Sequence, residues 1–145
     1  MQTFLPYSDF NLTTKCLDYK RLGKQRVEAY QIAACLLGWK TKSGKSYSGW
    51  KNHPACKMWK GYELALLHYM NVCIQEWVAR GYKNNMEIAD WIYLKEIIMP
   101  PWLGDERMHS SHRSNLLRKN FEFYSKFGWK EEIDIPYVWG KVYEI

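Results

Sequence analysis

Residues 54–81 read PACKMWKGYELALLHYMNVCIQEWVARG, and this stretch decides the fold class. Its apolar side chains recur every three or four residues, which is the spacing of one face of an α-helix. The members of that stripe are Met58, Tyr62, Ala65, Tyr69 and Val72, and it is widened by Trp59, Leu66, Cys73 and Trp77. Pro54 suits the first helical position, and Arg80 followed by Gly81 is typical of a helix end. We therefore predict one long helix from Pro54 to Arg80, buried at the centre of the protein.

The chain before this stretch carries two further helix signals. Ser8-Asp9 is typical of an N-cap and predicts a short helix up to about residue 17. Asp18 can cap a second helix over residues 18–37, which Gly38 stops. The core stripe predicted for this second helix is Val27, Tyr30, Ala34 and Leu37. Residues 38–49 have no periodicity and are rich in lysine, glycine and serine, so we expect a basic loop there.

After the long helix we expect two more helices and no strands. One covers residues 86–98 and stops at the following Pro100-Pro101, and the other begins at Ser110 or Ser111 and reaches Phe127. The extended tail carries the aromatic residues Tyr137, Trp139 and Tyr143. No segment alternates apolar and polar residues as a half-buried strand does. The predicted fold class is all-α, a compact single-domain helical bundle over residues 1–145 with an irregular aromatic C-terminal tail.

The distribution of charge favours a nucleic-acid partner. The net charge is +6, and the basic residues are concentrated in two blocks. Residues 15–60 hold eleven Lys and Arg against two carboxylates, and residues 107–130 hold six against one. Such segregation suits a polyanion, although a solvated basic face without a partner would give the same pattern. The eight Trp and eleven Tyr could stack on bases, and a bulky aromatic core is the alternative explanation.

The cysteines and the apolar runs argue against a zinc protein, a secreted protein and a membrane-spanning protein. Cys16, Cys35, Cys56 and Cys73 form no CxxC pair and have no His at metal-ligand spacing. We predict buried free thiols in a reducing compartment, with no zinc, other metal or cofactor. The chain start lacks the basic and apolar regions of a signal peptide, and no apolar run approaches the length of a membrane span.

One face of the helix predicted over residues 18–37 has the composition of an active site. At 100° per residue, Arg21, Gln25 and Glu28 fall within about 60° of one another. Glu28 is the one carboxylate between Asp18 and Glu63 in a strongly basic part of the chain. Such an acid suits general acid–base work or the stabilisation of positive charge on a sugar. An ordinary surface pair of Glu28 with Lys24, four residues earlier, is the alternative.

Two further motifs suit phosphate binding. Residues 49–54, GWKNHP, place Lys, Asn and His before a helix start, where free N–H groups and the helix dipole attract anions. His53 as a plain N-cap residue is the alternative. The second motif is GDERMHSSHR at 104–113, continuing to Arg118-Lys119. His109 and His112 are three residues apart, but no third ligand completes a metal site, so we expect them to face phosphate.

Six stretches, in this order, resemble the pyrimidine-dimer DNA glycosylase family, the phage endonuclease V type. They are LDYKRLGKQRVE at 17–28, GWKNHP at 49–54, RGY at 80–82, PWLGD at 101–105, HRSNLLRK at 112–119 and YSKFGW at 124–129. The resemblance spans nearly the whole chain. It implies a compact all-α protein that bends damaged duplex DNA, extrudes a base, removes the damaged pyrimidine and cleaves the abasic strand without a metal.

The resemblance also implies roles for particular residues. In that family the α-amine at the chain start attacks the sugar C1′ and forms a Schiff base, for which an ordinary pKa of about 8 is suited. A glutamate on the early helix stabilises the cationic sugar and moves protons during β-elimination. By position the catalytic residues are Met1, Glu28 and Arg21. Together with the basic motifs, the residues expected at the DNA are Lys24, Gln25, Arg26, Trp50, Lys51, Asn52, His53, His109, His112, Arg113, Arg118 and Lys126.

Several alternatives stay open. Well-studied family members have a small second residue and lose their Met, whereas Gln2 should keep Met1 in place. Its amine is the expected nucleophile, with Lys20, Lys24 or a water activated by Glu28 as alternatives. The expected substrate is a UV pyrimidine dimer, with another modified pyrimidine as the alternative. A non-catalytic module for distorted DNA and an RNA-binding protein are the other classes. We expect a cytoplasmic monomer (in the host cytoplasm if phage-encoded) that binds double-stranded DNA containing a lesion.

Overall fold

The computed structural model describes residues 1–141, and the predicted all-α class is confirmed. The helices are α1 (Phe10–Cys16), α2 (Tyr19–Leu37), α3 (Pro54–Lys57), α4 (Glu63–Ala79), α5 (Glu106–Lys119) and α6 (Phe121–Tyr124), with 3-10 turns η1 (Ser48–Trp50), η2 (Asp90–Leu94) and η3 (Ser125–Phe127). Within residues 1–141 the one extended pairing is an isolated bridge between Lys40 and Ser46. Tyr143 lies outside the described residues. Among the helices described, none combines the length and hydropathy that a membrane crossing requires.

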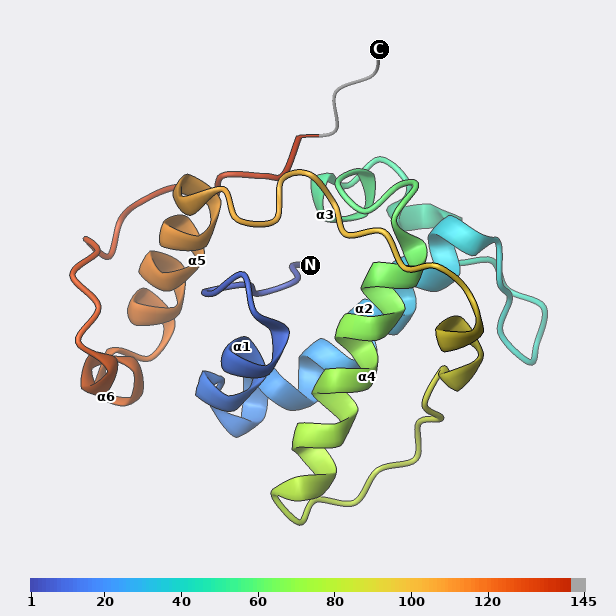
Figure 1. The fold of residues 1–145 in the computed structure, drawn as a ribbon, viewed down its shortest axis with the longest axis horizontal. Coiled ribbons are helices and arrows are strands. Elements are labelled where there is room, and N and C mark those ends of the chain that lie inside the picture. Colours follow the sequence, from blue (N-terminus) through green and yellow to red (C-terminus); the bar gives the residue numbers. More distant parts are fainter. Residues whose placement is uncertain (142–145) are drawn as a thin grey trace.

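Helices α2 and α4 form the centre of the molecule and pack against each other more extensively than any other pair of elements (Figure 1). The buried side of α4 includes Ala65, Leu66, Tyr69, Met70, Val72 and Cys73, so the predicted central position of this helix is confirmed. Helix α2 ends at Gly38, which has φ +72° and whose N–H donates to the carbonyl of Ala34. This is the left-handed stop that its glycine allows.

The core stripe that we predicted for α2 is correct at Ala34, which is 0% exposed, and at Tyr30, which packs against the core, but it is wrong at Val27 and Leu37. Val27 is 41% and Leu37 38% exposed, whereas the other buried residues of α2 are Leu22, Gln25, Ala29, Ile32 and Ala33. The reason is the bulk of α4. A Cβ added to Gly23 would lie 2.8 Å from the ring of Trp77, so the two helices approach closely where α2 offers small side chains. Hydrophobicity alone therefore selects only part of the buried face.

The single long helix predicted over residues 54–80 is also wrong, because α3 and α4 are separate. Between them Gly61 takes φ +88°, and its N–H donates to the Oε1 of Glu63 at 3.1 Å. The carbonyl of Met58 accepts from the indole of Trp102 at 2.8 Å instead of continuing a helical ladder. In the break the indole of Trp59 donates to the hydroxyl of Thr3 at 3.0 Å, which joins this turn to the N-terminal segment.

The C-terminal half departs from the prediction in two places. Residues 86–98 contain only the short η2, because the side chain of Asn71 hydrogen-bonds both backbone groups of Ala89 and so replaces helical pairing. Helix α5 begins at Glu106 rather than near Ser110, since Asp105 is its N-cap and accepts from the N–H of Arg107 at 3.1 Å. Helix α5 ends at Lys119, so the predicted continuous helix to Phe127 is divided at Asn120 (φ −152°).

Candidate active site

The first six residues form no regular element, yet residues 2–6 are buried between α5 on one side and α2 and α4 on the other (Figure 1). A buried backbone must have its polar groups paired, and here side chains supply the partners. The N–H of Leu5 donates to His112 Nδ1 at 2.8 Å, and its carbonyl lies 2.7 Å from His109 Nδ1. Arg113 donates to the carbonyl of Pro6 at 2.7 Å. Helix α5 therefore holds the N-terminal segment by hydrogen bonds to Leu5 and Pro6.

On the opposite side, Gln25 of α2 binds the same segment. Its Oε1 accepts from the N–H of Phe4 and from the hydroxyl of Tyr69, both at 2.8 Å. Its Nε2 donates to the carbonyl of Gln2 at 2.9 Å and to the carboxylate of Glu28 at 3.1 Å. Gln25 is only 1% exposed, so its amide joins the N-terminal segment to Glu28 inside the protein.

A cavity of about 350 Å³ opens beside the chain start. Its lining comes from the N-terminal segment, α2, the end of α5 and the aromatic tail, and consists of Met1, Gln2, Phe4, Lys20, Arg21, Lys24, Gln25, Glu28, Lys119 and Tyr137. Four of these side chains are cations and one is a carboxylate. The cavity is therefore an electropositive recess that contains a single acid among the described residues.

Glu28 is held in place by three neighbours. One oxygen lies 3.4 Å from the N–H of Gln2 and 3.1 Å from Gln25, and the other lies 3.9 Å from the Nζ of Lys24. The side chain of Glu28 is 13% exposed, whereas that of Lys24 is 75% exposed. The predicted surface pair with Lys24 thus exists, but Glu28 also belongs to the cavity wall. Arg21 reaches the same recess and makes an ion pair with Asp18 at 3.2 Å.

His53, the residue before α3, does not line the cavity but feels the charges beside it. Its Nδ1 accepts from the N–H of Ala55 at 3.0 Å, so it is the N-cap residue that we gave as the alternative. Burial lowers the pKa of His53, the N-terminal amine lowers it further, and Glu28 opposes both effects. His53 therefore lies within electrostatic reach of the amine and the carboxylate. Its ring meets the rings of Trp50 and Trp139 edge-on at centroid distances of 6.4 and 5.8 Å.

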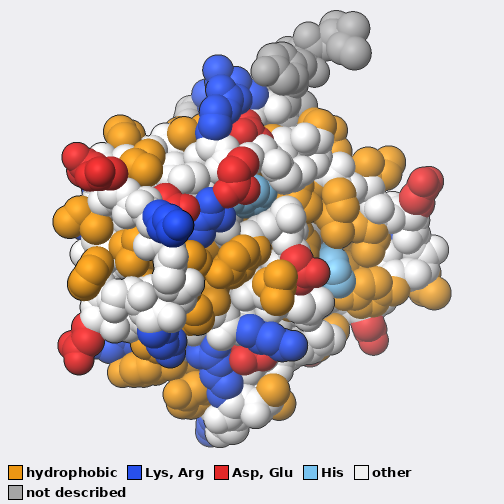
Figure 2. All heavy atoms as spheres, turned by 60° about the vertical axis from the view of Figure 1, so that its left-hand side comes forward, with side chains coloured by type: hydrophobic (Ala, Val, Ile, Leu, Met, Phe, Trp, Pro, Cys, Tyr) orange, Lys and Arg blue, Asp and Glu red, His pale blue; other side chains and the backbone are white. Residues whose placement is uncertain are grey.

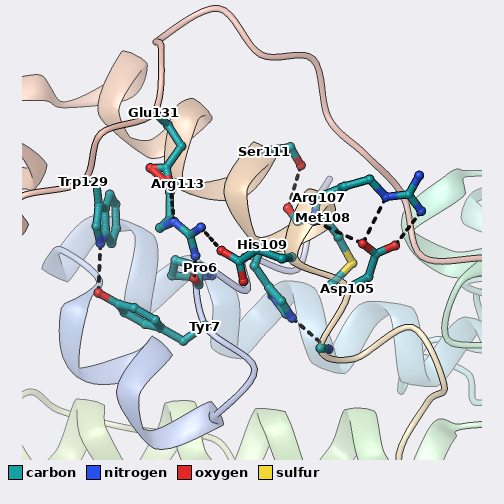
Figure 3. Close-up of polar contacts among 12 residues, drawn as sticks. Pro6, Tyr7, Asp105, Arg107, Met108, His109, Ser111, Arg113, Trp129 and Glu131 are labelled. Carbon is teal, nitrogen blue, oxygen red and sulfur yellow. Dashed lines mark hydrogen bonds and ion pairs between the residues drawn. The ribbon is translucent and has the colours of Figure 1, made fainter.

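The residues predicted at the DNA fall into two groups. The exposed ones are Lys24, Trp50, Lys51, Asn52, Arg118 and Lys126, and His53 is half-buried. The others are already engaged inside the protein. Arg26 lies 4.4 Å over the ring of Trp77 and donates to Asn84 at 2.7 Å, and Gln25 is buried as described. Arg113 makes ion pairs with Glu106 and with Glu131, and Figure 3 shows the pair with Glu131.

The prediction that His109 and His112 face phosphate is wrong. They are 1% and 0% exposed, and both bind Leu5. Figure 2 shows that the face carrying α5 and the tail is mixed, with acidic and hydrophobic side chains among the Lys and Arg. Within residues 1–141 no group of three or more His, Cys, Asp or Glu is arranged to hold a metal ion. The sequence pattern of this motif is compatible with a surface or a core position, and the tertiary contact to Leu5 decides between them.

Four cavity residues were not predicted from the sequence. They line the recess although none was proposed as a site residue, and they are Gln2, Phe4, Lys119 and Tyr137. The signal for Lys119 was its place at the end of the basic stretch 112–119, and Tyr137 was noted only as part of the aromatic tail. Burial lowers the pKa of Lys119, and the nearby charges of Arg21, Arg118 and Lys24 lower it further. The cations of two distant blocks therefore meet at one recess.

A comparison with known protein families found a match that covers the first part of the chain. A family model described as pyrimidine dimer DNA glycosylase matches residues 1–90, which is more than half of the chain and contains Met1, Arg21 and Glu28. A search of curated proteins found no match. A search of solved structures also found none.

Proposed function

Because the chain belongs to the pyrimidine dimer DNA glycosylase family, we propose that it excises UV-induced pyrimidine dimers from duplex DNA and then cleaves the abasic strand through a Schiff base on the Met1 amine. The observation that carries the proposal is the placement of Met1 and Glu28 in the wall of one cavity, with the N–H of Gln2 3.4 Å from the Glu28 carboxylate. An amine and a carboxylate beside one recess are the two groups that this chemistry requires.

The reaction begins when the lone pair of the Met1 nitrogen forms a bond to the sugar C1′. The C1′–N1 bond breaks, and the base keeps the electron pair and takes up a proton while it stays joined to the other pyrimidine of the dimer. Positive charge builds on the sugar in this step, and the Glu28 carboxylate stabilises it. The nitrogen then loses a proton, the C1′–O4′ bond opens with protonation of O4′, and a C=N bond forms. Glu28 removes a proton from C2′, and the C3′–O bond breaks so that the phosphate leaves with its electron pair.

Met1 is favoured over the neighbouring lysines as the nucleophile. An amine must be neutral to attack, and α-amines as a class ionise about two and a half pKa units below lysine amines. The segment that carries Met1 is fixed by hydrogen bonds from α2, α4 and α5, whereas the side chain of Lys24 is 75% exposed. An amine that is already held in place loses less conformational entropy when it reaches the sugar than a mobile side chain does.

The cations around the recess suit the strand that carries the lesion. The cavity is lined by four cations, Lys20, Arg21, Lys24 and Lys119. The exposed Lys51 lies in the chain between η1 and His53. Each can pair with a DNA phosphate, which positions the duplex without reading its sequence. A binding module would gain nothing from a carboxylate among these cations, so Glu28 favours the enzyme over the non-catalytic alternative.

The proposal is tested with a duplex that carries one cyclobutane pyrimidine dimer at a defined position. Under single-turnover conditions we expect strand cleavage at the dimer and none in the same duplex without it. A duplex with an abasic site should be cleaved without any glycosylase step. Binding to the dimer without release of a base would support the binding module instead. Cleavage at an oxidised or otherwise modified pyrimidine, but not at the dimer, would overturn the substrate assignment.

A further inference from the structure

The motif HSSH at residues 109–112 is not used by the proposed chemistry, although it supplies two buried histidines. The two rings lie one helical turn apart on α5 and contact the same residue of another segment. Leu5 is 0% exposed and offers one N–H and one carbonyl, and His112 and His109 take one each. Leu5 is separated from them by more than a hundred residues, so the contact holds two ends of the chain together.

The hydrogen bonds fix the proton position on each ring. His109 Nε2 lies 2.9 Å from the N–H of Gly104, so it accepts there, and its proton is on Nδ1, which donates to the Leu5 carbonyl. His112 Nδ1 accepts from the N–H of Leu5, so the proton of His112 is on Nε2. One neutral ring donates and the other accepts. Any other pair of protonation states would break a bond to Leu5 or to Gly104.

We propose that His109 and His112 are positioning residues, which hold the Leu5 peptide groups from α5 and thereby fix where the Met1 amine stands relative to Glu28. This inference rests on the proposed function. The contacts form a continuous path, because Leu5 is followed toward the chain start by Phe4 and Gln2, whose backbone groups bind Gln25. Gln25 in turn binds Glu28 at 3.1 Å. Loss of His112 leaves the N–H of Leu5 without its partner, so α5 then holds the segment only through His109 and Arg113.

His112 also bears a feature that packing alone would not favour. Its Nε2 is buried and has no hydrogen-bond partner within residues 1–141, although a buried N–H without a partner lowers stability. The ring meets the rings of Phe4 and Tyr137 edge-on at 6.1 and 5.8 Å, and both of these residues line the cavity. Groups kept at a cost to stability are typical of functional sites. The ring therefore supports the cavity wall and the chain start together.

The test compares three variants of α5. His112→Phe keeps the volume of the ring but removes the acceptor, and His112→Asn returns an acceptor close to the position of Nδ1. Met108→Ala is the matched control, because Met108 is 0% exposed on the same helix and makes no hydrogen bond to Leu5. All measurements are made at a temperature at which each variant is fully folded. This condition separates an effect on the position of the Met1 amine from an effect of lower overall stability.

Two readouts are taken on each variant. The first is amide hydrogen exchange at Leu5 and Gln2, which we expect to accelerate at least about tenfold in His112→Phe and to stay near wild type in Met108→Ala. The second is the single-turnover rate of borohydride trapping on dimer-containing DNA. A 1 Å misplacement of a reacting group can cost on the order of a hundredfold, so we expect a loss of at least about tenfold in His112→Phe, with DNA affinity unchanged. His112→Asn should restore most of this rate.

The outcomes separate the two proposals. Unchanged exchange at Gln2 in His112→Phe would overturn the positioning role, and so would an equal loss of trapping in Met108→Ala at matched stability. If the wild-type protein traps no DNA at all, the proposed function fails. In that case the exchange at Gln2 and Leu5 still decides whether α5 fixes the chain start.

Discussion

Replacing Glu28 by Gln removes one negative charge from the cavity while keeping the size and the hydrogen-bonding reach of the side chain. The Oε1 of glutamine can still accept from the N–H of Gln2 and from Gln25, so the fold should be retained. In the transition state positive charge develops on a sugar beside Lys20, Arg21, Lys24 and Lys119. Without Glu28 the described residues that line the recess offer no carboxylate to balance that charge.

The magnitude follows from Coulomb's law. A carboxylate about 4 Å from the sugar cation contributes about 4 kcal/mol at an effective dielectric constant of about 20, or roughly a thousandfold in rate. Lys24, whose Nζ is 3.9 Å from Glu28, reduces this benefit. We therefore expect base release to fall at least about a hundredfold, within the range for acid–base groups. Affinity for lesion DNA should hold or rise, because a negative charge facing phosphates has gone.

The assay is single-turnover base excision and equilibrium binding on the same dimer-containing duplex. Glu76→Gln is the matched control, since Glu76 also pairs with a cation four residues away on a helix, with its carboxylate 3.0 Å from Arg80. The control should excise like the wild type. Excision by Glu28→Gln within about threefold of the wild type would refute the electrostatic argument and leave Glu28 as a structural residue.

Three further predictions concern binding, metal and pH. Lys51→Ala should reduce the slope of log K against log salt by about 0.9, whereas Lys95→Ala, an exposed residue after η2 that lies outside both basic blocks, should not; equal slopes in both would count against a phosphate contact at Lys51. Excision should survive a strong chelator, and loss of activity that zinc restores would contradict the metal-free mechanism. Burial, with smaller effects of His109 and Arg113, lowers the pKa of His112 to about 3. At a pH between about 6.5, the ordinary pKa of histidine, and about 3, the unfolded chain binds a proton at His112 that the folded chain does not bind. The free energy of unfolding should therefore fall as the pH falls, by at most about 1.4 kcal/mol per pH unit. In a denaturation series, His112→Asn should make that fall shallower.

Local signals in the sequence predicted correctly where α1 begins and where α2 ends. Asp9 caps α1 by accepting from the N–H of Leu12, and Gly38 ends α2 in the left-handed conformation, as the residue types indicate. The grouping of Arg21, Gln25 and Glu28 on one face also follows from helical periodicity alone. These features depend on residues close together in the chain, which is why a single sequence reveals them.

The remaining features depend on contacts between distant segments. The sequence around His109 and His112 does not show that Leu5 lies against them, and so they were assigned to the surface. The division of the predicted long helix depends on Gly61 and on the bond from Trp102 to Met58. Lys119 and Tyr137 reach the cavity only because α5 and the tail pack beside the chain start. Periodicity carries no information about such placements.

The nucleophile is tested most directly by reducing the covalent intermediate. The protein is incubated with a duplex containing one pyrimidine dimer in the presence of borohydride, and the cross-linked peptide is identified by mass spectrometry after trypsin digestion. The account predicts a stable adduct on the α-amine of the peptide that begins at Met1. An adduct on Lys20 or Lys24, or excision of the base without any trapped adduct, would contradict it.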